Sequence, residues 1–297
     1  MGTNGIIVID KPAGWTSMDV CAKLRGMYRE KRIGHAGTLD PMATGVLPVF
    51  IGRATRAVEF ASEGEKEYVA GLKLGLITNT QDTSGETLEQ RPVSVTPDQL
   101  EQALSKFRGD IEQIPPMYSA IKIGGKKLCD LARQGVTVER EAREVTIHSL
   151  KAEKINEREY TLDVRCSKGT YIRTLCADIG ARLGCGGAMK TLCRASASGF
   201  TLDDAHTLTE LENMTESERE ACVFAVEHIF LKHRQVILPD FFAKLAHSGL
   251  EIYLKKINLD LPLGTLVRLS DKEGFFALGE VLEYADGLAI KPIRQFE

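Results

Sequence analysis

Residues 34–47, GHAGTLDPMATGVL, restrict the backbone of this chain more than any other stretch. These fourteen positions contain three glycines, with the pair Asp40-Pro41 between them. Glycine adopts backbone conformations closed to other residues and lets a ligand come close to the main chain, whereas an Asp-Pro pair usually forms a turn. We therefore expect a tight loop around a single carboxylate. Asp40 is then either a turn residue bonded to backbone N–H groups or a nucleophile or base.

The surroundings of Asp40 argue against several familiar reactions. An aspartyl phosphotransferase of the D-x-D-x-T kind needs a second acid at position 42, where this chain has Met42. The sequence also lacks the P-loop, the nucleophile elbow of serine hydrolases and the H-E-x-x-H metal motif. The seven cysteines are an odd number and fall in no C-x-x-C pair, which favours reduced thiols over metal ligands. We expect neither a metal nor a cofactor.

Three helices are the clearest of the expected elements. Thr16 or Ser17 caps the first, and Thr96 with Gln99 forms a capping box before the second. The third, over 167–184, repeats apolar residues every three or four positions and starts directly after a strand.

Strands are expected between these helices. Pro48 places one of them at a sheet edge or a bulge, because proline cannot donate to a strand ladder. Residues 77–90 are rich in Thr, Asp and Gly, so we expect a polar loop outside the core. The expected strands in the first part of the chain are 5–10, 45–51, 66–75, 143–155 and 160–166.

Charge and periodicity divide the chain near residue 235. Residues 203–227 carry eight acidic side chains and one arginine, so the rest of the chain has a charge of +4 although the total is −3. We expect an acidic connector of short helices there. After Pro239, strand patterns separated by Gly- and Asp-containing turns return. The sequence therefore predicts one domain over 1–234 and a small β domain over 235–297.

The chain has no apolar run near the roughly 20 residues that cross a bilayer, and its first residues do not form a signal peptide. We therefore expect a cytoplasmic protein that makes no use of a membrane.

Four stretches closely resemble the TruB-type tRNA pseudouridine synthases, which act on uridine 55 in the T-loop. Besides the motif around Asp40, they are IDKPAGWTS (9–17), KEYVAGLKLG (66–75) and CSKGTYIRTL (166–175). The resemblance implies an α+β pseudouridine synthase fold, with a mixed, mainly antiparallel sheet and a central cleft. It also implies that the C-terminal segment is a PUA-like, β-barrel-like module that helps to hold the tRNA outside the T-loop.

The resemblance also gives roles to residues of this chain. It makes Asp40 the nucleophile, Tyr68 the aromatic side chain that stacks on the target base, and Arg173 the cation beside the aspartate. Around Leu192 the sequence departs from the usual family form, because Cys193 stands where an arginine is common. The positions that match family residues contacting the substrate nucleotide or bordering the site are Lys11, His35, Tyr171 and Leu192.

These residue types suit a reaction on a flipped-out base. Unstacking a base costs a few kcal/mol, and stacking on an aromatic side chain returns roughly 1–3 kcal/mol. We expect Tyr68 and Leu192 to form two walls around the base, and the Tyr68 hydroxyl group is a candidate for removing the C5 proton. Arg173 would keep Asp40 ionised against desolvation. The residues leave open whether Asp40 attacks C6 of the base or C1′ of the ribose, or expels the base by another route.

The expected partner is tRNA, bound through its T-loop and its acceptor and T-arms, and no obligate protein partner is expected. Two other functions stay open, namely a non-catalytic tRNA chaperone, for which Asp40→Asn is silent, and a small-molecule hydrolase that uses Asp40. Four basic residues opposed only by Asp130 either bind phosphates or form a solvated surface. They are Lys122, Lys126, Lys127 and Arg133.

Overall fold

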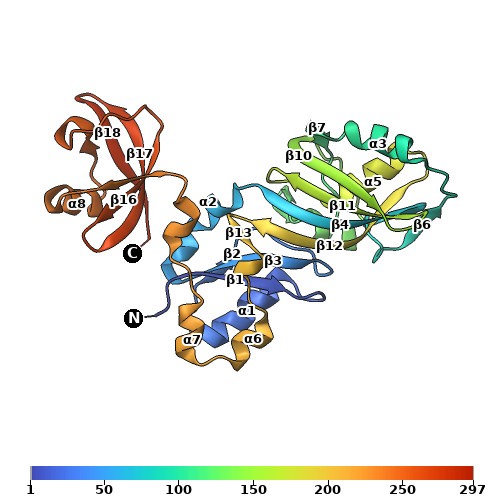
Figure 1. The fold of residues 1–297 in the computed structure, drawn as a ribbon, viewed down its shortest axis with the longest axis horizontal. Helices are drawn as coiled ribbons and strands as arrows, with labels where there is room; N and C mark the ends of the chain where they lie inside the picture. Colours follow the sequence, from blue (N-terminus) through green and yellow to red (C-terminus); the bar gives the residue numbers. More distant parts are fainter. Residues whose placement is uncertain (1, 297) are drawn as a thin grey trace.

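Two β-sheets organise residues 2–296, the part of the chain that the structure describes. The structure is a computed structural model. A nine-stranded sheet occupies most of the described chain, and a five-stranded sheet forms the end drawn at the left of Figure 1. Helices and loops flank both. The expected α+β class with a mixed, mainly antiparallel sheet is confirmed.

The larger sheet is antiparallel except where β3 meets β12, which run parallel. In the order of pairing its strands are β1 (Gly5–Lys11), β3 (Thr44–Ile51), β12 (Gly187–Ala197), β4 (Lys66–Leu74), β11 (Glu159–Cys166), β10 (Arg143–Lys154) and β7 (Gly109–Gln113). Two short strands complete it, β2 (Ile33–His35) beside β3 and β13 (Phe200–Thr201) beside β12.

The sequence patterns explain how these strands are buried. β1 is almost wholly buried, in keeping with its unbroken apolar run, whereas β4 alternates between buried and more exposed residues. Its buried face, with Tyr68, Ala70 and Leu72, joins the main core of the molecule.

The prediction that Pro48 marks an edge or a bulge is wrong. Pro48 pairs with Val8 of β1 without a break in register, and its carbonyl oxygen accepts a hydrogen bond of 3.0 Å from the Ala36 N–H group on the other flank. On that flank, β12 pairs only with the start of β3, and β2 only with its end. The proline therefore lies between these two pairings, where no ladder donor is needed.

The helices start where capping chemistry places them. Thr16 caps α1 (Ser17–Tyr28) and Thr96 caps α3 (Pro97–Ser105), both with capping boxes. α5 (Ile172–Arg182) begins later than predicted, because Gly169 takes a positive φ of 81° and Tyr171 is its extended N-cap. The short helices of the first part are η1 (Gly52–Ala57), α2 (Val58–Ser62) and α4 (Leu128–Arg133).

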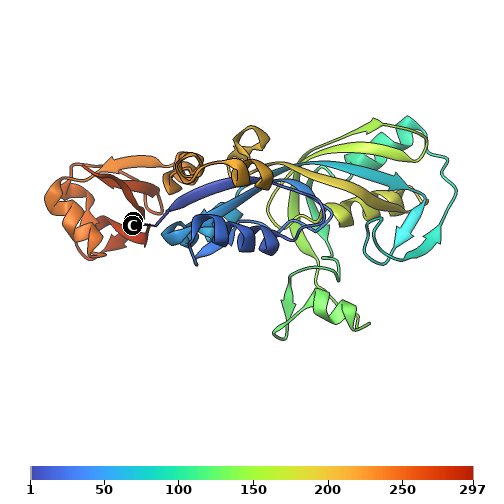
Figure 2. The ribbon, with the colours of Figure 1, turned by 90° about the horizontal axis from the view of Figure 1, so that it is seen from below.

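A small hairpin stands away from the large sheet. It consists of β8 (Lys122–Ile123) and β9 (Lys126–Lys127), and it leads directly into α4. Figure 2 shows this segment projecting from the body of the molecule. We call residues 122–133 the basic hairpin.

The loop expected over 77–90 is more ordered than predicted. β5 (Leu76–Thr78) and β6 (Thr87–Gln90) pair across it, and Thr78 and Asp82 are both buried. The prediction that this segment lies outside the core is therefore wrong for these two residues, whose polar groups are satisfied by hydrogen bonds within the loop.

The acidic connector consists of short helices, as predicted, and leads to the smaller sheet. The helices are η2 (Leu202–Asp204), α6 (Leu208–Asn213), α7 (Glu216–Ala221) and η3 (Val226–Phe230). The smaller sheet contains, in order of pairing, β14 (Arg234–Ile237), β16 (Leu266–Asp271), β17 (Gly274–Tyr284), β18 (Gly287–Gln295) and β15 (Ile252–Tyr253), and it is accompanied by α8 (Asp240–His247) and η4 (Leu254–Lys256).

The two parts of the chain share a core. Phe200 and Phe230 from before the smaller sheet pack in one cluster with Leu278 and Phe296. The smaller sheet also has a core of its own around Val267. The smaller sheet is thus fixed to the first part of the chain by buried apolar contacts.

Candidate active site

Asp40 and Arg173 form an ion pair, although 133 residues separate them in the chain. Arg173 Nε lies 2.8 Å from Asp40 Oδ2, and Nη2 donates to Oδ1 over 3.3 Å. The Arg173 side chain is only 6% exposed, whereas that of Asp40 is 34% exposed. The arginine is therefore part of the protein interior, and the carboxylate it holds is open to a ligand.

The remaining donors of the Arg173 guanidinium group are also used. Nη2 donates to the Tyr118 carbonyl oxygen at 2.7 Å, and Nη1 donates to that of Thr80 at 3.1 Å. The position of Arg173, second in α5, brings it to these carbonyls from two separate loops. The planar group is thus fixed on several sides, which fixes the orientation of Asp40.

Asp82 is a second carboxylate beside Arg173, and the sequence reasoning missed it. Its Oδ2 lies 4.0 Å from Arg173 Nε, and its side chain is 8% exposed. Its Oδ1 accepts hydrogen bonds from the hydroxyl groups of Thr80 at 2.8 Å and Ser84 at 2.6 Å. Asp82 is therefore bonded within its own loop and adds negative charge behind the arginine. The D-x-S spacing of an Asx turn at 82–84 is the signal that could have marked it.

Tyr68 and Leu192 lie on neighbouring strands and on the same face of the sheet. Leu192 of β12 is opposite Ala70 of β4, and Arg194 is opposite Tyr68, so Tyr68 and Leu192 are diagonal neighbours. Both are buried in the main core. They form adjoining parts of one surface. Burial raises the pKa of the Tyr68 hydroxyl group, and the nearby Arg194 opposes that rise.

Arg194 is a buried cation that holds the ends of the Asp40 loop. Its Nε donates to the Val46 carbonyl oxygen at 2.8 Å, and its Nη2 donates to that of Gly37 at 3.0 Å. Gly45 has a φ of 99°, and a Cβ there would lie 2.3 Å from the Arg194 carbonyl oxygen. The close packing of β12 on this loop explains why the sequence has glycine at that position. Arg194 was not among the predicted residues.

Lys11 secures the same loop from the other side. It is fully buried, and its Nζ donates to the carbonyl oxygens of Pro12 at 2.9 Å, Trp15 at 2.7 Å and Pro41 at 3.3 Å. Burial lowers the pKa of Lys11 to about 8, while the negative charge of Asp40 opposes this change. Lys11 therefore adds a positive charge near Asp40 and holds Pro41, the residue that follows Asp40 in the chain.

His35 and Tyr171 border this arrangement. His35 ends β2, and its buried Nδ1 has no hydrogen-bond partner among residues 2–296. Burial lowers the pKa of His35, and Arg194 lowers it further, so the neutral ring is favoured. Tyr171 is the N-cap of α5, and Gln113 holds its backbone through two hydrogen bonds.

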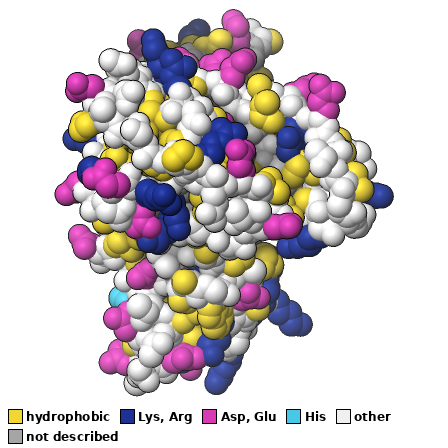
Figure 3. Space-filling model, turned by 90° about the vertical axis from the view of Figure 1, so that its right-hand side faces the viewer, with side chains coloured by type: hydrophobic (Ala, Val, Ile, Leu, Met, Phe, Trp, Pro, Cys, Tyr) yellow, Lys and Arg dark blue, Asp and Glu magenta, His cyan; other side chains and the backbone are white. Residues whose placement is uncertain are grey.

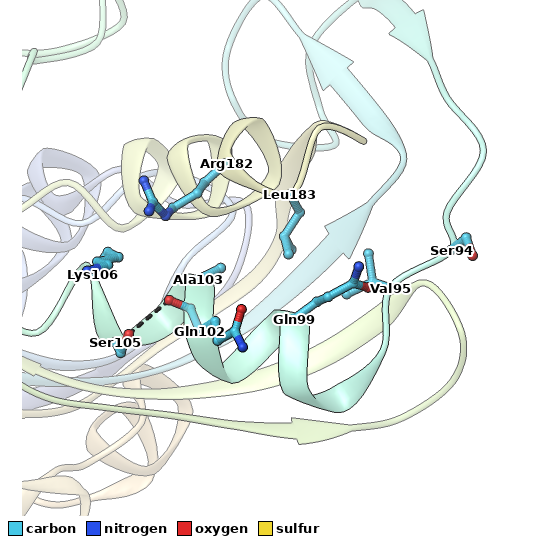
Figure 4. Close-up of a pocket in the computed structure, with 9 residues that line it drawn as sticks. All are labelled: Ser94, Val95, Gln99, Gln102, Ala103, Ser105, Lys106, Arg182 and Leu183. Carbon is cyan, nitrogen blue, oxygen red and sulfur yellow. Dashed lines mark hydrogen bonds between the residues drawn. The ribbon is translucent and has the colours of Figure 1, made fainter.

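One cavity in the described part of the chain lies away from Asp40. Figure 4 shows this pocket of about 840 Å³ between α3 and the end of α5. Its polar lining includes Gln102, Lys106 and Arg182 but no carboxylate or histidine. The pocket lies at the end of α5, next to Arg182 and Leu183, whereas Arg173 is at the start of that helix.

Residues 2–296 contain neither a cluster of metal-ligating side chains nor a helix that could span a membrane. No group of three or more His, Cys, Asp or Glu side chains there could hold a metal ion. The same residues contain no helix that is long and apolar enough to span a membrane.

Comparison with known proteins places the chain among RNA-modifying enzymes. Residues 25–172 match the TruB family pseudouridylate synthase N-terminal domain, and residues 173–239 match the tRNA pseudouridylate synthase B C-terminal domain. A tRNA pseudouridine synthase B from Alkaliphilus oremlandii is 44% identical over 280 residues, which cover 94% of this chain and 93% of the relative. The tRNA pseudouridine synthase B of Clostridium tetani is 38% identical over 278 residues, which cover 93% of this chain and 95% of the relative.

The fold is similar to that of chains in solved structures of complexes that contain Cbf5. A chain in the crystal structure of a Cbf5-Nop10-Gar1 complex superposes with a TM-score of 0.72 at 26% identity, covering 99% of this chain and 85% of that chain. A chain of the archaeal box H/ACA sRNP Nop10-Cbf5 complex gives a TM-score of 0.71 at 25% identity, covering 99% and 86%. Because the superposition covers nearly the whole chain, the similarity extends into the smaller sheet.

Proposed function

This chain belongs to the TruB family of pseudouridylate synthases, and we propose that it converts uridine 55 in the T-loop of tRNA into pseudouridine. The observation that carries this proposal is the contact of 2.8 Å between a buried arginine and a solvent-accessible aspartate, Asp40, in a glycine-rich loop. An enzyme that acts on a nucleotide from outside needs a reactive group that is both accessible and fixed. Asp40 has both properties.

Asp40 acts as the nucleophile on the flipped-out nucleotide. Pseudouridine formation breaks the N-glycosidic bond, turns the uracil and rejoins it through C5. A nucleophilic carboxylate must be ionised for this, and a poorly hydrated site works against ionisation. The two-pronged contact with Arg173 pairs the carboxylate with a cation and holds it in one orientation. Asp82, Lys11 and Arg194 hold the surroundings of this pair in place.

Tyr68 and Leu192 provide the apolar surface against which the base rests. Their diagonal placement on β4 and β12 gives an aromatic and an aliphatic contact side by side. Stacking on Tyr68 offsets part of the cost of taking the base out of the RNA. The Tyr68 hydroxyl group is the polar group on this surface and the candidate for moving the C5 proton. His35 and Tyr171 contact the target nucleotide or its neighbours.

The rest of the tRNA is bound outside the Asp40 site. The basic hairpin projects from the body with exposed lysines and meets phosphates of the T-arm. Figure 3 shows basic and acidic side chains interspersed over the end of the molecule, without one large field of a single sign on the face drawn. Residues 235–297 form a PUA-like domain that contacts the acceptor arm.

The reaction needs no cofactor and no obligate protein partner. It takes place in the cytoplasm, a location supported by seven cysteines that are all free thiols.

The experiment that tests this function maps pseudouridine in unmodified tRNA transcripts after incubation with the protein. We expect pseudouridine at position 55 alone, and none in a matched transcript that has cytidine at this position. Binding of tRNA without any pseudouridine would instead identify a chaperone. Turnover of small esters or glycosides without RNA would identify a hydrolase.

A further inference from the structure

Ser119 has a buried hydroxyl group that no hydrogen bond of normal geometry within the fold accounts for. It lies in the stretch IPPMYSAIK, between β7 and the basic hairpin, and it is only 6% exposed. Its Oγ makes no hydrogen bond of normal geometry to any residue between 2 and 296. A buried polar group without a partner is costly, so its presence calls for a functional explanation.

The backbone around Ser119 is held firmly at the edge of the active site. The carbonyl oxygen of the preceding residue, Tyr118, accepts the hydrogen bond of 2.7 Å from Arg173. The carbonyl oxygen of Ser119 itself accepts one of 3.1 Å from the Cys129 N–H group. Ser119 thus sits between the arginine of the site and the base of α4, with its main chain held on both sides.

Tyr171 is a polar neighbour of Ser119, because it lies two residues before Arg173, whose guanidinium group binds the carbonyl oxygen of Tyr118 next to Ser119. Its N–H group donates to Gln113 Oε1 at 2.9 Å, and its carbonyl oxygen accepts from Gln113 Nε2 at 3.1 Å, so the main chain is fixed. Burial raises the pKa of the Tyr171 hydroxyl group, and the Ser119 hydroxyl group opposes this rise most strongly. The charges of Arg143, Arg173 and Asp40 also act on the Tyr171 hydroxyl group, so this group is near the ion pair of the site.

Resting on the proposed function, we propose that Ser119 is a positioning residue whose hydroxyl group donates a hydrogen bond to the Tyr171 hydroxyl oxygen when the RNA is bound. A phenol oxygen that accepts a hydrogen bond still has its own proton to donate. With Ser119 as donor on one side, the Tyr171 proton is directed away from Ser119 and towards the target nucleotide. Gln113 fixes the main chain of Tyr171, and Ser119 fixes the direction of its hydroxyl group.

A double-mutant cycle on the full-length protein tests this role, with pseudouridine formation in a tRNA transcript as the readout. Ser119→Ala should lower kcat/KM by roughly three- to tenfold, the value of one ordinary hydrogen bond. In a Tyr171→Phe background, which lacks the accepting oxygen, Ser119→Ala should have no further effect. Ser105→Ala is the matched control, because that hydroxyl group bonds only the Gln102 carbonyl oxygen on α3, and it should leave kcat/KM unchanged.

Equal losses from Ser119→Ala in both backgrounds would overturn the proposal, since they would show a merely structural role. Unchanged kcat/KM for Ser119→Ala in the wild-type background would overturn it as well. If the melting temperature shows that Ser119→Ala does not fold, Ser119→Cys, which has a much weaker donor of similar size, takes its place in the same cycle. Failure of the proposed function is distinguishable, because the wild-type protein itself would then form no pseudouridine.

Discussion

The Asp40 loop and the basic hairpin are held by the protein in opposite ways. Buried cations fix the loop, because Lys11 bonds the carbonyl oxygen of Pro41 and Arg194 bonds those of Gly37 and Val46. The hairpin has two-residue strands with exposed side chains and projects from the body. Chemistry at a base requires reacting groups fixed to within about half an ångström, whereas contacts with phosphates tolerate movement. The comparison therefore separates residues that set the rate from residues that set RNA affinity.

Asp40→Asn should have the largest effect in the fixed region. The amide cannot serve as the nucleophile, although it keeps the size of the side chain and one of the two contacts with Arg173. We expect the rate of pseudouridine formation to fall by at least about 10³-fold. Quench-flow measurements under single-turnover conditions give this rate. Affinity for the same tRNA, measured by filter binding, should change little. An Asp40→Asn protein that still forms pseudouridine at the normal rate would contradict the claim that the Asp40 loop sets the rate.

Tyr68→Phe tests the hydroxyl group on the apolar surface beside the loop. The ring and its stacking are kept, while the group that could move the C5 proton is lost. We expect the single-turnover rate to fall on the order of 10²-fold, the usual range of acid–base catalysis, with unchanged RNA affinity. Full turnover by Tyr68→Phe would exclude its hydroxyl group from proton transfer and leave stacking as its role.

Replacing Lys126 and Lys127 with alanine tests the basic hairpin. Loss of two phosphate contacts should weaken tRNA binding by roughly three- to tenfold and reduce the slope of log affinity against log salt by about 1–2. The single-turnover rate at saturating enzyme should stay the same. Lys23→Ala is a control, because Lys23 forms an ion pair with Glu212 in another part of the molecule. An unchanged salt slope would show that the hairpin does not meet phosphates.

Asp178→Asn should give the smallest effect, and it concerns stability only. Asp178 lies on α5, as Arg173 does, and burial raises its pKa to about 6 from an ordinary value of 3.8. The folded state then binds more protons than the unfolded chain between these values, so the carboxylate costs stability as the pH rises through this window. Asp178→Asn should raise the free energy of unfolding by about 1–2 kcal/mol at pH 7.5 and by much less at pH 4. Urea titrations at the two pH values measure this difference, and an equal gain at both would assign the effect to packing.

Local sequence chemistry predicted the elements better than it predicted the site. The capping boxes at Thr16 and Thr96 depend on residues three positions apart, and both helices start there. The start of α5 was placed too early, because Tyr171 is held outside the helix by Gln113, 58 residues away. Such a contact leaves no local pattern.

The same reason explains which site residues were missed. Asp40 and Arg173 lie in stretches that match a known family, so the resemblance singled them out. Asp82 and Arg194 gain their importance from long-range contacts, with Arg173 and with Gly37 and Val46, that the spacing of residues along the chain does not reveal. The polar composition of residues 77–90 predicts a loop outside the core, although these polar residues are what satisfy the buried carboxylate of Asp82.

The ion pair between Asp40 and Arg173 is the centre of this account, and Arg173→Ala tests it most directly. Single-turnover rate and tRNA affinity are measured on the same protein, with Arg108→Ala as a matched control. Arg108 likewise bonds a carboxylate, that of Glu101, and a carbonyl oxygen, that of Leu150, but outside the site. We predict that Arg173→Ala lowers the rate by about 10²- to 10³-fold and changes affinity less than about threefold, while Arg108→Ala changes neither. Equal losses of rate and affinity in Arg173→Ala would contradict the account, because they would show that this arginine only binds RNA.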